Sequence, residues 1–183
     1  INQAVIEVDD LIRKQPGCFQ AYLLQGQLLQ AMNQHANAIH SFDAALKIKP
    51  NYAEALNARG VSLESLHQLD GALVCYEQAI HIDPNYAGVY INRGNILQKQ
   101  QRFHESVKSY EAAYHLSPSI EYLHGILLHN RMRLCDWQGF SESTKRIENI
   151  KEGEKLIMCL PALAAVDSLQ SHRRVAESWV SDQ

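Results

Sequence analysis

The sequence lacks a long apolar run and an excess of charge of either sign. Its longest apolar run, Leu156 to Val166, is interrupted by Pro161 and is shorter than the about 20 residues that a membrane helix needs. The 17 basic and 20 acidic residues nearly balance, which argues against a general surface for nucleic acid or anionic lipid. We therefore expect neither a nucleic-acid nor a membrane partner.

Cysteine is scarce, and the few cysteines lie far apart in the sequence. The four cysteines lie far apart and form no CxxC pair, so neither a disulfide framework nor a zinc site is indicated. We expect them to be small apolar residues in a reducing, cytoplasmic compartment. No signal peptide is visible, and the chain begins with Ile1. The expectation is therefore a piece of a longer protein.

Motifs that carry catalysis are also missing. The sequence contains no HExxH, GxSxG, P-loop or GxGxxG string. Among its nine histidines, His35 and His40 are five positions apart, as are His124 and His129, a spacing that does not share a helix face. We expect no catalytic residue, metal or cofactor in this chain.

What the sequence does contain is a repeat of 34 residues. Small, aromatic and aliphatic residues recur in phase at this spacing, and a proline closes each period. The columns are Pro16, Pro50, Pro84 and Pro118; Gly26, Gly60 and Gly94; Ala4, Ala38, Ala72 and Ser106; Val8, Phe42, Tyr76 and Tyr110; Leu11, Ala45, Ala79 and Ala113; Leu29, Leu63 and Leu97; and Tyr22, Leu56 and Tyr90.

Each column has a physical role within a pair of helices. The apolar spacing predicts one helix from Phe19 to about Met32 and a second from about His35 to Ile48. Glycine and alanine allow the two backbones to approach, and the aromatic residue fills the space beside them. The proline prevents the second helix from continuing. Such a pair cannot bury its apolar face alone, so the pairs must stack.

These columns resemble the tetratricopeptide repeat family. The resemblance implies an all-α superhelical solenoid of antiparallel helix pairs, with a concave groove lined by the first helix of each pair. It divides the chain into the second helix of a truncated repeat (1–16), three repeats within 19–118 (19–52, 53–86 and 87–118), a capping helix (119–134) and a helical junction region (135–183).

A second resemblance begins where the repeats end. Cys135-Asp136-Trp137 is followed by Leu160-Pro161-Ala162-Leu163 and a helix from Leu169 to Trp179. This order resembles the junction before the catalytic domain in O-linked N-acetylglucosamine transferases and their bacterial relatives. Histidines that some members carry are absent from 156–165. The sugar-nucleotide site of that family lies in parts not present here, so no catalytic residue is assigned. Trp137 and Trp179 are open to two readings, local packing or contact with another domain.

The family geometry implies which side chains line the groove. Asparagine and glutamine both donate and accept hydrogen bonds, so they suit the backbone of an extended peptide. Asn92 falls in the column where the O-linked transferases carry a ladder of asparagines, but Leu24 and Ala58 occupy the equivalent places. A carboxylate clamp needs several basic residues, and only Lys99 is available. The candidate groove residues are Gln20, Gln27, Glu54, Asn57, Asn92, Asn95, Gln98 and Lys99.

Three functions are compatible with this pattern. The first is a protein-binding module that recognises substrates for a glycosyltransferase using UDP-N-acetylglucosamine, with the catalytic domain outside this chain. The second is a free-standing scaffold or adaptor. The third is self-association through the groove or the ends of the array. In each case the partner is a polypeptide or a neighbouring domain.

Overall fold

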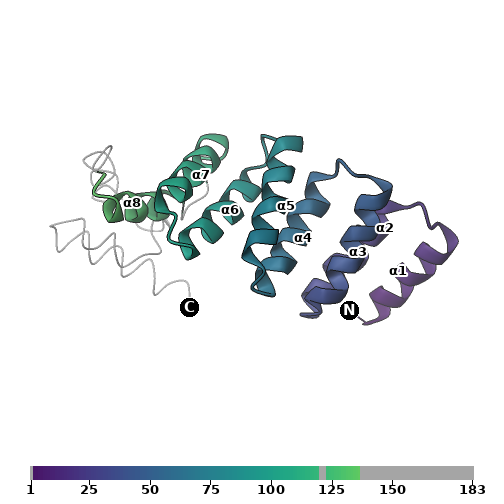
Figure 1. Ribbon diagram of the computed structural model, residues 1–183. Helices are drawn as coiled ribbons and strands as arrows, with labels where there is room; N and C mark the ends of the chain where they lie inside the picture. Colours follow the sequence, from purple (N-terminus) through teal and green to yellow (C-terminus); the bar gives the residue numbers. More distant parts are fainter. Residues whose placement is uncertain (1, 120–122, 137–183) are drawn as a thin grey trace, which may run out of the picture. The chain divides into compact units, whose positions relative to one another are not determined.

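The computed structural model describes residues 2–119 and 123–136. Within these ranges every regular secondary-structure element is an α-helix (Figure 1). The helices are α1 (Asn2–Lys14), α2 (Phe19–Ala31), α3 (His35–Ile48), α4 (Ala53–Ser65), α5 (Leu69–Ile82), α6 (Ala87–Lys99), α7 (Phe103–Leu116) and α8 (Leu123–Arg133). The two helices predicted in the first repeat therefore exist, within a residue of their predicted ends. Trp137, Trp179 and the rest of 137–183 lie outside the described residues.

The chain forms two compact units, Ile1–Ile96 and Leu97–Gln183. In the first unit, α2 packs on α3 and α4 packs on α5, so that each repeat is a helix pair. Helix α3 also packs on α4, and α1 packs on α2, which joins neighbouring pairs (Figure 1). In the second unit, α7 packs on α8.

The core of the first helix pair shows why the small residues recur. A Cβ added at Gly26 would lie 2.3 Å from Cε1 of Phe42, far inside van der Waals contact. The same added atom at Gly60 would lie 2.5 Å from Cε1 of Tyr76. Both rings are fully buried. The glycine column thus exists because an aromatic ring occupies the space where its side chain would be.

The turn inside each pair has the same backbone conformation. Asn33, His67 and Gln101 have φ values of 57°, 59° and 61°, in the left-handed region that non-glycine residues seldom adopt. In the first turn, Gln34 N donates to Leu29 O at 2.9 Å and Asn33 N donates to Gln30 O at 2.9 Å. These two bonds make a Schellman motif, which satisfies the last carbonyls of the helix.

Polar contacts connect successive helix pairs at a fixed spacing. On α2, Gln25 Nε2 donates to Asp9 Oδ1 at 2.6 Å, and Gln25 Oε1 accepts from Ser41 Oγ at 2.7 Å. Each partner lies 16 residues from Gln25, one before it and one after it. A single side chain on a first helix therefore bridges the preceding and the following second helices.

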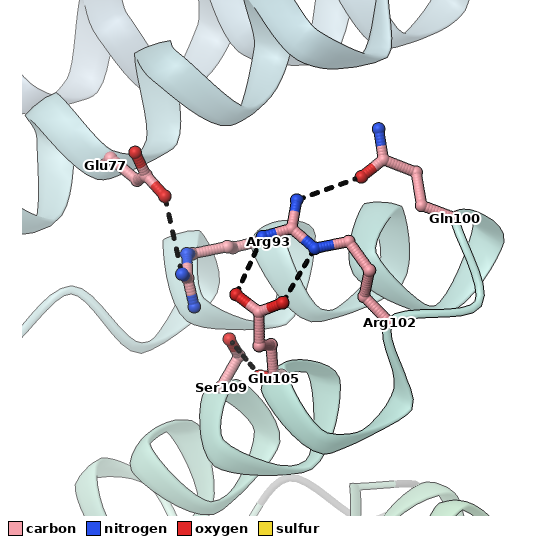
Figure 2. A network of polar contacts seen from close by, with 6 residues as sticks. All are labelled: Glu77, Arg93, Gln100, Arg102, Glu105 and Ser109. Atoms are coloured by element: carbon pink, nitrogen blue, oxygen red, sulfur yellow. Dashed lines mark hydrogen bonds and ion pairs between the residues drawn. The ribbon is translucent and has the colours of Figure 1, made fainter.

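The next repeat uses the same positions with charged residues. Arg59 Nε lies 2.7 Å from Asp43 Oδ1, and its Nη1 donates to Cys75 Sγ at 2.9 Å. Burial raises the pKa of the Cys75 thiol, and the nearby Arg59 charge opposes that rise. One repeat later, Arg93 pairs with Glu77 at 3.4 Å (Figure 2). We call this set of contacts the bridging ladder.

The second unit has a charged contact of its own at the start of α7. Arg102 Nε and Nη2 each lie 2.7 Å from one carboxylate oxygen of Glu105 (Figure 2). Two parallel bonds to one carboxylate are the strong, directional form of an arginine ion pair. They lie in the first turn of α7, where a carboxylate also interacts favourably with the helix dipole.

Candidate polypeptide-binding face

A row of polar side chains links the first helices of the repeats in the first unit. Gln27 Nε2 on α2 donates to Glu54 Oε1 on α4 at 3.4 Å. Asn92 Nδ2 on α6 donates to Asn57 Oδ1 on α4 at 2.9 Å. Glu54 and Asn57 are three residues apart on one helix, so they share a face. We call Gln27, Glu54, Asn57 and Asn92 the polar row.

Gln30, three residues after Gln27 on α2, also joins α2 to α4. Gln30 Nε2 donates to the Ala58 carbonyl and approaches the Ser62 hydroxyl, both at 2.8 Å. The Ser62 side chain is fully buried, so its hydroxyl needs a partner within the protein. These bonds fix the spacing of the two helices that present Gln27 and Glu54.

Two tyrosines border the polar row at the turns between repeats. Tyr52 OH donates to Glu54 Oε2 at 3.1 Å, and Asn57 Nδ2 donates to Tyr86 OH at 3.4 Å. Burial, then the hydrogen bond and charge of Glu54, raise the pKa of Tyr52 to about 12. Burial and the charge of Glu54 also raise the pKa of Tyr86, against the Asn57 hydrogen bond. Both hydroxyls therefore keep their protons at neutral pH.

The structure brings together four of the eight predicted groove residues. Gln27 with Glu54 and Asn57 with Asn92 form the pairs given above. Gln20 is exposed near the start of α2, where Cys18 Sγ lies 3.6 Å from its Oε1.

The other predicted groove residues lie on the rest of α6. Asn95 is half-buried on that helix. Gln98 and the exposed Lys99 belong to the second unit, in which Gln98 Oε1 accepts from Tyr110 OH at 3.0 Å. Their role in binding stays a prediction.

Sequence reasoning missed the tyrosines that border the polar row. Tyr52 and Tyr86 are 34 residues apart, and each follows a Pro-Asn pair. The 34-residue spacing could have indicated these tyrosines. A residue in a turn, however, has no helical periodicity from which to predict the surface that its side chain contacts. The bridging ladder was missed as well, although its Arg59 and Arg93 recur at the same spacing.

Comparison with known proteins identifies the repeat. Residues 19–52 and 87–120 match the model described as tetratricopeptide repeat, and residues 65–101 match a second model described as TPR repeat. The chain contains tetratricopeptide repeats. Tetratricopeptide repeats generally mediate binding between proteins, so this is a protein-interaction repeat domain. No curated protein matches the sequence.

Solved structures with tetratricopeptide repeats share the fold. A crystal structure of MamA protein has a TM-score of 0.70 at 16% identity, covering 79% of this chain and 81% of that one. MamA 41-end from Desulfovibrio magneticus RS-1 has a TM-score of 0.70 at 21% identity, covering 79% and 82%. The Arabidopsis OM64 TPR domain has a TM-score of 0.60 at 18% identity, covering 62% and 94%. Over the described residues, the predicted all-α solenoid of antiparallel helix pairs is confirmed. The further C-terminal helices predicted within 137–183 lie outside those residues.

Two further properties concern the residues that the structure describes. None of their helices combines the length and the apolar character that crossing a bilayer requires. Over the same residues, no three His, Cys, Asp or Glu side chains gather in a way that would hold a metal ion. The polar row offers three side-chain amides, which donate and accept hydrogen bonds, and one carboxylate, which accepts them.

Proposed function

We propose that this tetratricopeptide-repeat domain binds an extended polypeptide along the polar row. The observation that supports the proposal is the Asn92–Asn57–Tyr86 chain of hydrogen bonds across α4 and α6. It orients both amides and leaves the Asn92 Oδ1 atom and one Nδ2 hydrogen for a ligand. An extended peptide backbone presents N–H and C=O groups that match this pair.

The polar row is suited to binding because it is ordered before the ligand arrives. A side chain already held in one rotamer loses less entropy when a partner docks. Gln27 is held by Glu54, and Asn92 is held by Asn57. Recognition would thus depend on backbone groups of the ligand more than on one particular side chain.

The test uses random dodecapeptides displayed on phage and selected against this chain. Selected peptides are synthesised, and their affinity is measured by fluorescence anisotropy. We expect the Asn57→Ala/Asn92→Ala double variant to bind them at least about tenfold more weakly, because about 1 kcal/mol is lost per hydrogen bond and 1.4 kcal/mol is a factor of ten.

A matched control separates binding from folding. Asn37→Ala removes an exposed asparagine from the second helix α3, where its Nδ2 donates to Gln34 Oε1 at 3.1 Å, one turn away. This variant should keep the native affinity, and both variants should keep the native helical circular dichroism. Equal affinity of the native chain and the double variant for every selected peptide would exclude the polar row as the binding surface.

A finer proposal concerns the parent protein. The order of residues from Cys135 onwards supports a substrate-recognition region of an O-linked N-acetylglucosamine transferase-like enzyme. Of this segment the structure describes Cys135 and Asp136, whose N donates to Arg131 O at 2.9 Å. The full-length protein should then transfer N-acetylglucosamine from UDP-N-acetylglucosamine to a protein acceptor. Absence of transfer by the full-length protein would favour the alternative, a free-standing scaffold. The cytoplasmic location of the protein stays a prediction.

A further inference from the structure

Two turns between repeats carry equivalent tyrosines in different surroundings. Tyr52 follows Pro50, and Tyr86 follows Pro84, at the repeat spacing of 34 residues. Both tyrosines border the polar row, through Glu54 and Asn57 respectively. Because Tyr52 and Tyr86 occupy equivalent positions in successive repeats, the residues around them can be compared position by position.

The first turn contains its own cation. Lys49 Nζ lies 4.6 Å from the ring centroid of Phe19 and 4.8 Å from that of Tyr52. The two rings meet edge to face, with centroids 5.1 Å apart. An ammonium at this distance from an aromatic face is held by the ring quadrupole. The aromatic site of the first turn is therefore occupied by the chain itself.

The second turn keeps the tyrosine but changes the residues around it. Asp83 occupies the place equivalent to Lys49, and Ala53 occupies the place equivalent to Phe19. The exchange of lysine for aspartate removes a positive charge and adds a negative one. None of the cation–ring contacts in the described residues involves Tyr86. The second turn thus has the aromatic ring without the cation.

The surroundings of Tyr86 are negative. Tyr86 N donates to the Asp83 carbonyl at 3.3 Å, and the Tyr86 hydroxyl accepts from Asn57, which lies one turn after Glu54 on α4. After burial, the charges of Glu54 and Asp83 both raise the pKa of the Tyr86 hydroxyl. Both carboxylates belong to exposed residues. Asp83 is held by Asn85 N, which donates to its Oδ1 at 3.1 Å. A cation on this ring would gain from the aromatic face and from two acidic groups together.

We propose that Tyr86, with Glu54 and Asp83, binds a lysine or arginine side chain of the polypeptide that lies along the polar row. The proposal rests on the proposed function and adds a sequence requirement to it. Lys49 on Tyr52 is the internal example of the contact. The bound peptide supplies the cation for the second turn, where Asp83 replaces the equivalent of Lys49.

The experiment starts from the phage-selected dodecapeptides that need Asn57 and Asn92. We expect them to share a lysine or arginine at one position. Replacing that lysine by norleucine, or that arginine by citrulline, should weaken binding to the native chain about fivefold or more. The same replacement should have little effect on the Tyr86→Leu variant and on the Glu54→Gln/Asp83→Asn variant, because the cation site has been removed there.

Two further variants sharpen the assignment. Asp83→Lys places a lysine at the position equivalent to Lys49, next to Tyr86, so it should abolish the preference for a basic peptide residue. Glu7→Gln removes one exposed negative charge from α1, and it should leave the preference unchanged. Raising the salt concentration should reduce the preference in the native chain, since exposed charges are screened.

The outcomes distinguish this inference from the function on which it rests. Peptides that need Asn57 and Asn92 but tolerate norleucine or citrulline would overturn the cation site and leave the polar row standing. A basic preference that persists in the Tyr86→Leu and Glu54→Gln/Asp83→Asn variants would also overturn it, because the cation would bind elsewhere. If no selected peptide needs the two asparagines, both proposals fail.

Discussion

At the scale of single residues, the repeat is fixed by steric exclusion. Gly60 is required because the fully buried ring of Tyr76 occupies the volume next to its backbone. The sequence predicted that glycine permits close approach, and the structure shows which atoms approach. The left-handed residues His67 and Gln101 were not predicted. Their positions carry no glycine, which is the residue that normally signals such a conformation.

The glycine column gives the first stability prediction. Gly60→Ala places a Cβ 2.5 Å from Cε1 of Tyr76, so the ring or the helix must move. We expect a loss of about 1–3 kcal/mol in the free energy of unfolding, the usual cost of overpacking a core. Urea denaturation followed by far-UV circular dichroism measures it.

Another glycine of the same repeat provides the control. A Cβ at Gly71 would lie 3.6 Å from Leu63 Cδ1, which is ordinary contact. Gly71→Ala in α5 should be neutral or stabilising by up to about 1 kcal/mol, because alanine has the higher helix propensity. A Gly60→Ala variant as stable as Gly71→Ala would show that the close approach has no energetic consequence.

At the scale of helices, the bridging ladder explains how neighbouring pairs keep their register. On α2 and on α4, one side chain contacts the second helices before and after it. The apolar columns predicted the helices and their pairing, because burial follows helical periodicity. They could not predict the ladder, because Asp43 and Arg59 are partly exposed polar residues that periodicity leaves unassigned.

The ladder predicts a measurable coupling between helices α3 and α4. The Arg59 and Asp43 side chains are 30% and 41% exposed. We expect a double-mutant cycle of Arg59→Met and Asp43→Asn to give a coupling of about 0.5–1 kcal/mol that decreases in 1 M salt. Thermal or urea denaturation of the four proteins supplies the energies.

A surface pair within one helix is the matched control for this cycle. Arg13 and Asp10 on α1 lie 3.1 Å apart, but their side chains are 79% and 54% exposed. The corresponding cycle should give close to zero, since solvent and salt screen such a pair. If the two cycles give the same coupling energy, the ladder does not join helices any better than an ordinary surface pair.

The polar row shows how far sequence reasoning reached toward the candidate site. The resemblance to the tetratricopeptide repeat family implied that Gln27, Glu54, Asn57 and Asn92 line one groove, and the structure links them in pairs. Tyr86 was missed because it lies in a turn. Side chains that approach from turns depend on the stacking of two repeats, which a single period does not reveal.

At the scale of the molecule, the 34-residue period predicted stacked helical hairpins, and the resemblance to the tetratricopeptide repeat family implied the solenoid. Stacked repeats contact only their neighbours, so local pattern determines nearly all of the architecture. Stability should then vary along the chain with the number of neighbours that a helix has. Helix α5 buries Ala72, Tyr76 and Ala79 completely, whereas α1 leaves Ile6 55% and Leu11 39% exposed.

This difference predicts unequal protection of backbone amides. In native-state hydrogen exchange followed by mass spectrometry, the amides of α5 should exchange at least about tenfold more slowly than those of α1, which corresponds to ~1.4 kcal/mol. The physical reason is that α1 opens without disturbing a buried aromatic ring. Exchange at one common rate in both helices would instead indicate that the first unit opens only as a whole.

The bridging ladder also bears on how such a chain can grow. The repeat at residues 53–86 contains Arg59, which pairs with Asp43 of the preceding repeat, and Glu77, which pairs with Arg93 of the following repeat. A tandem duplication of this segment in the gene would bring both halves of the contact with it. In the lengthened chain, Arg59 of the inserted copy could pair with Glu77 of the original repeat, and Glu77 of the copy could pair with Arg93. Duplication of a whole repeat therefore keeps the bridging ladder intact, while an insertion of another length would shift the paired side chains out of register.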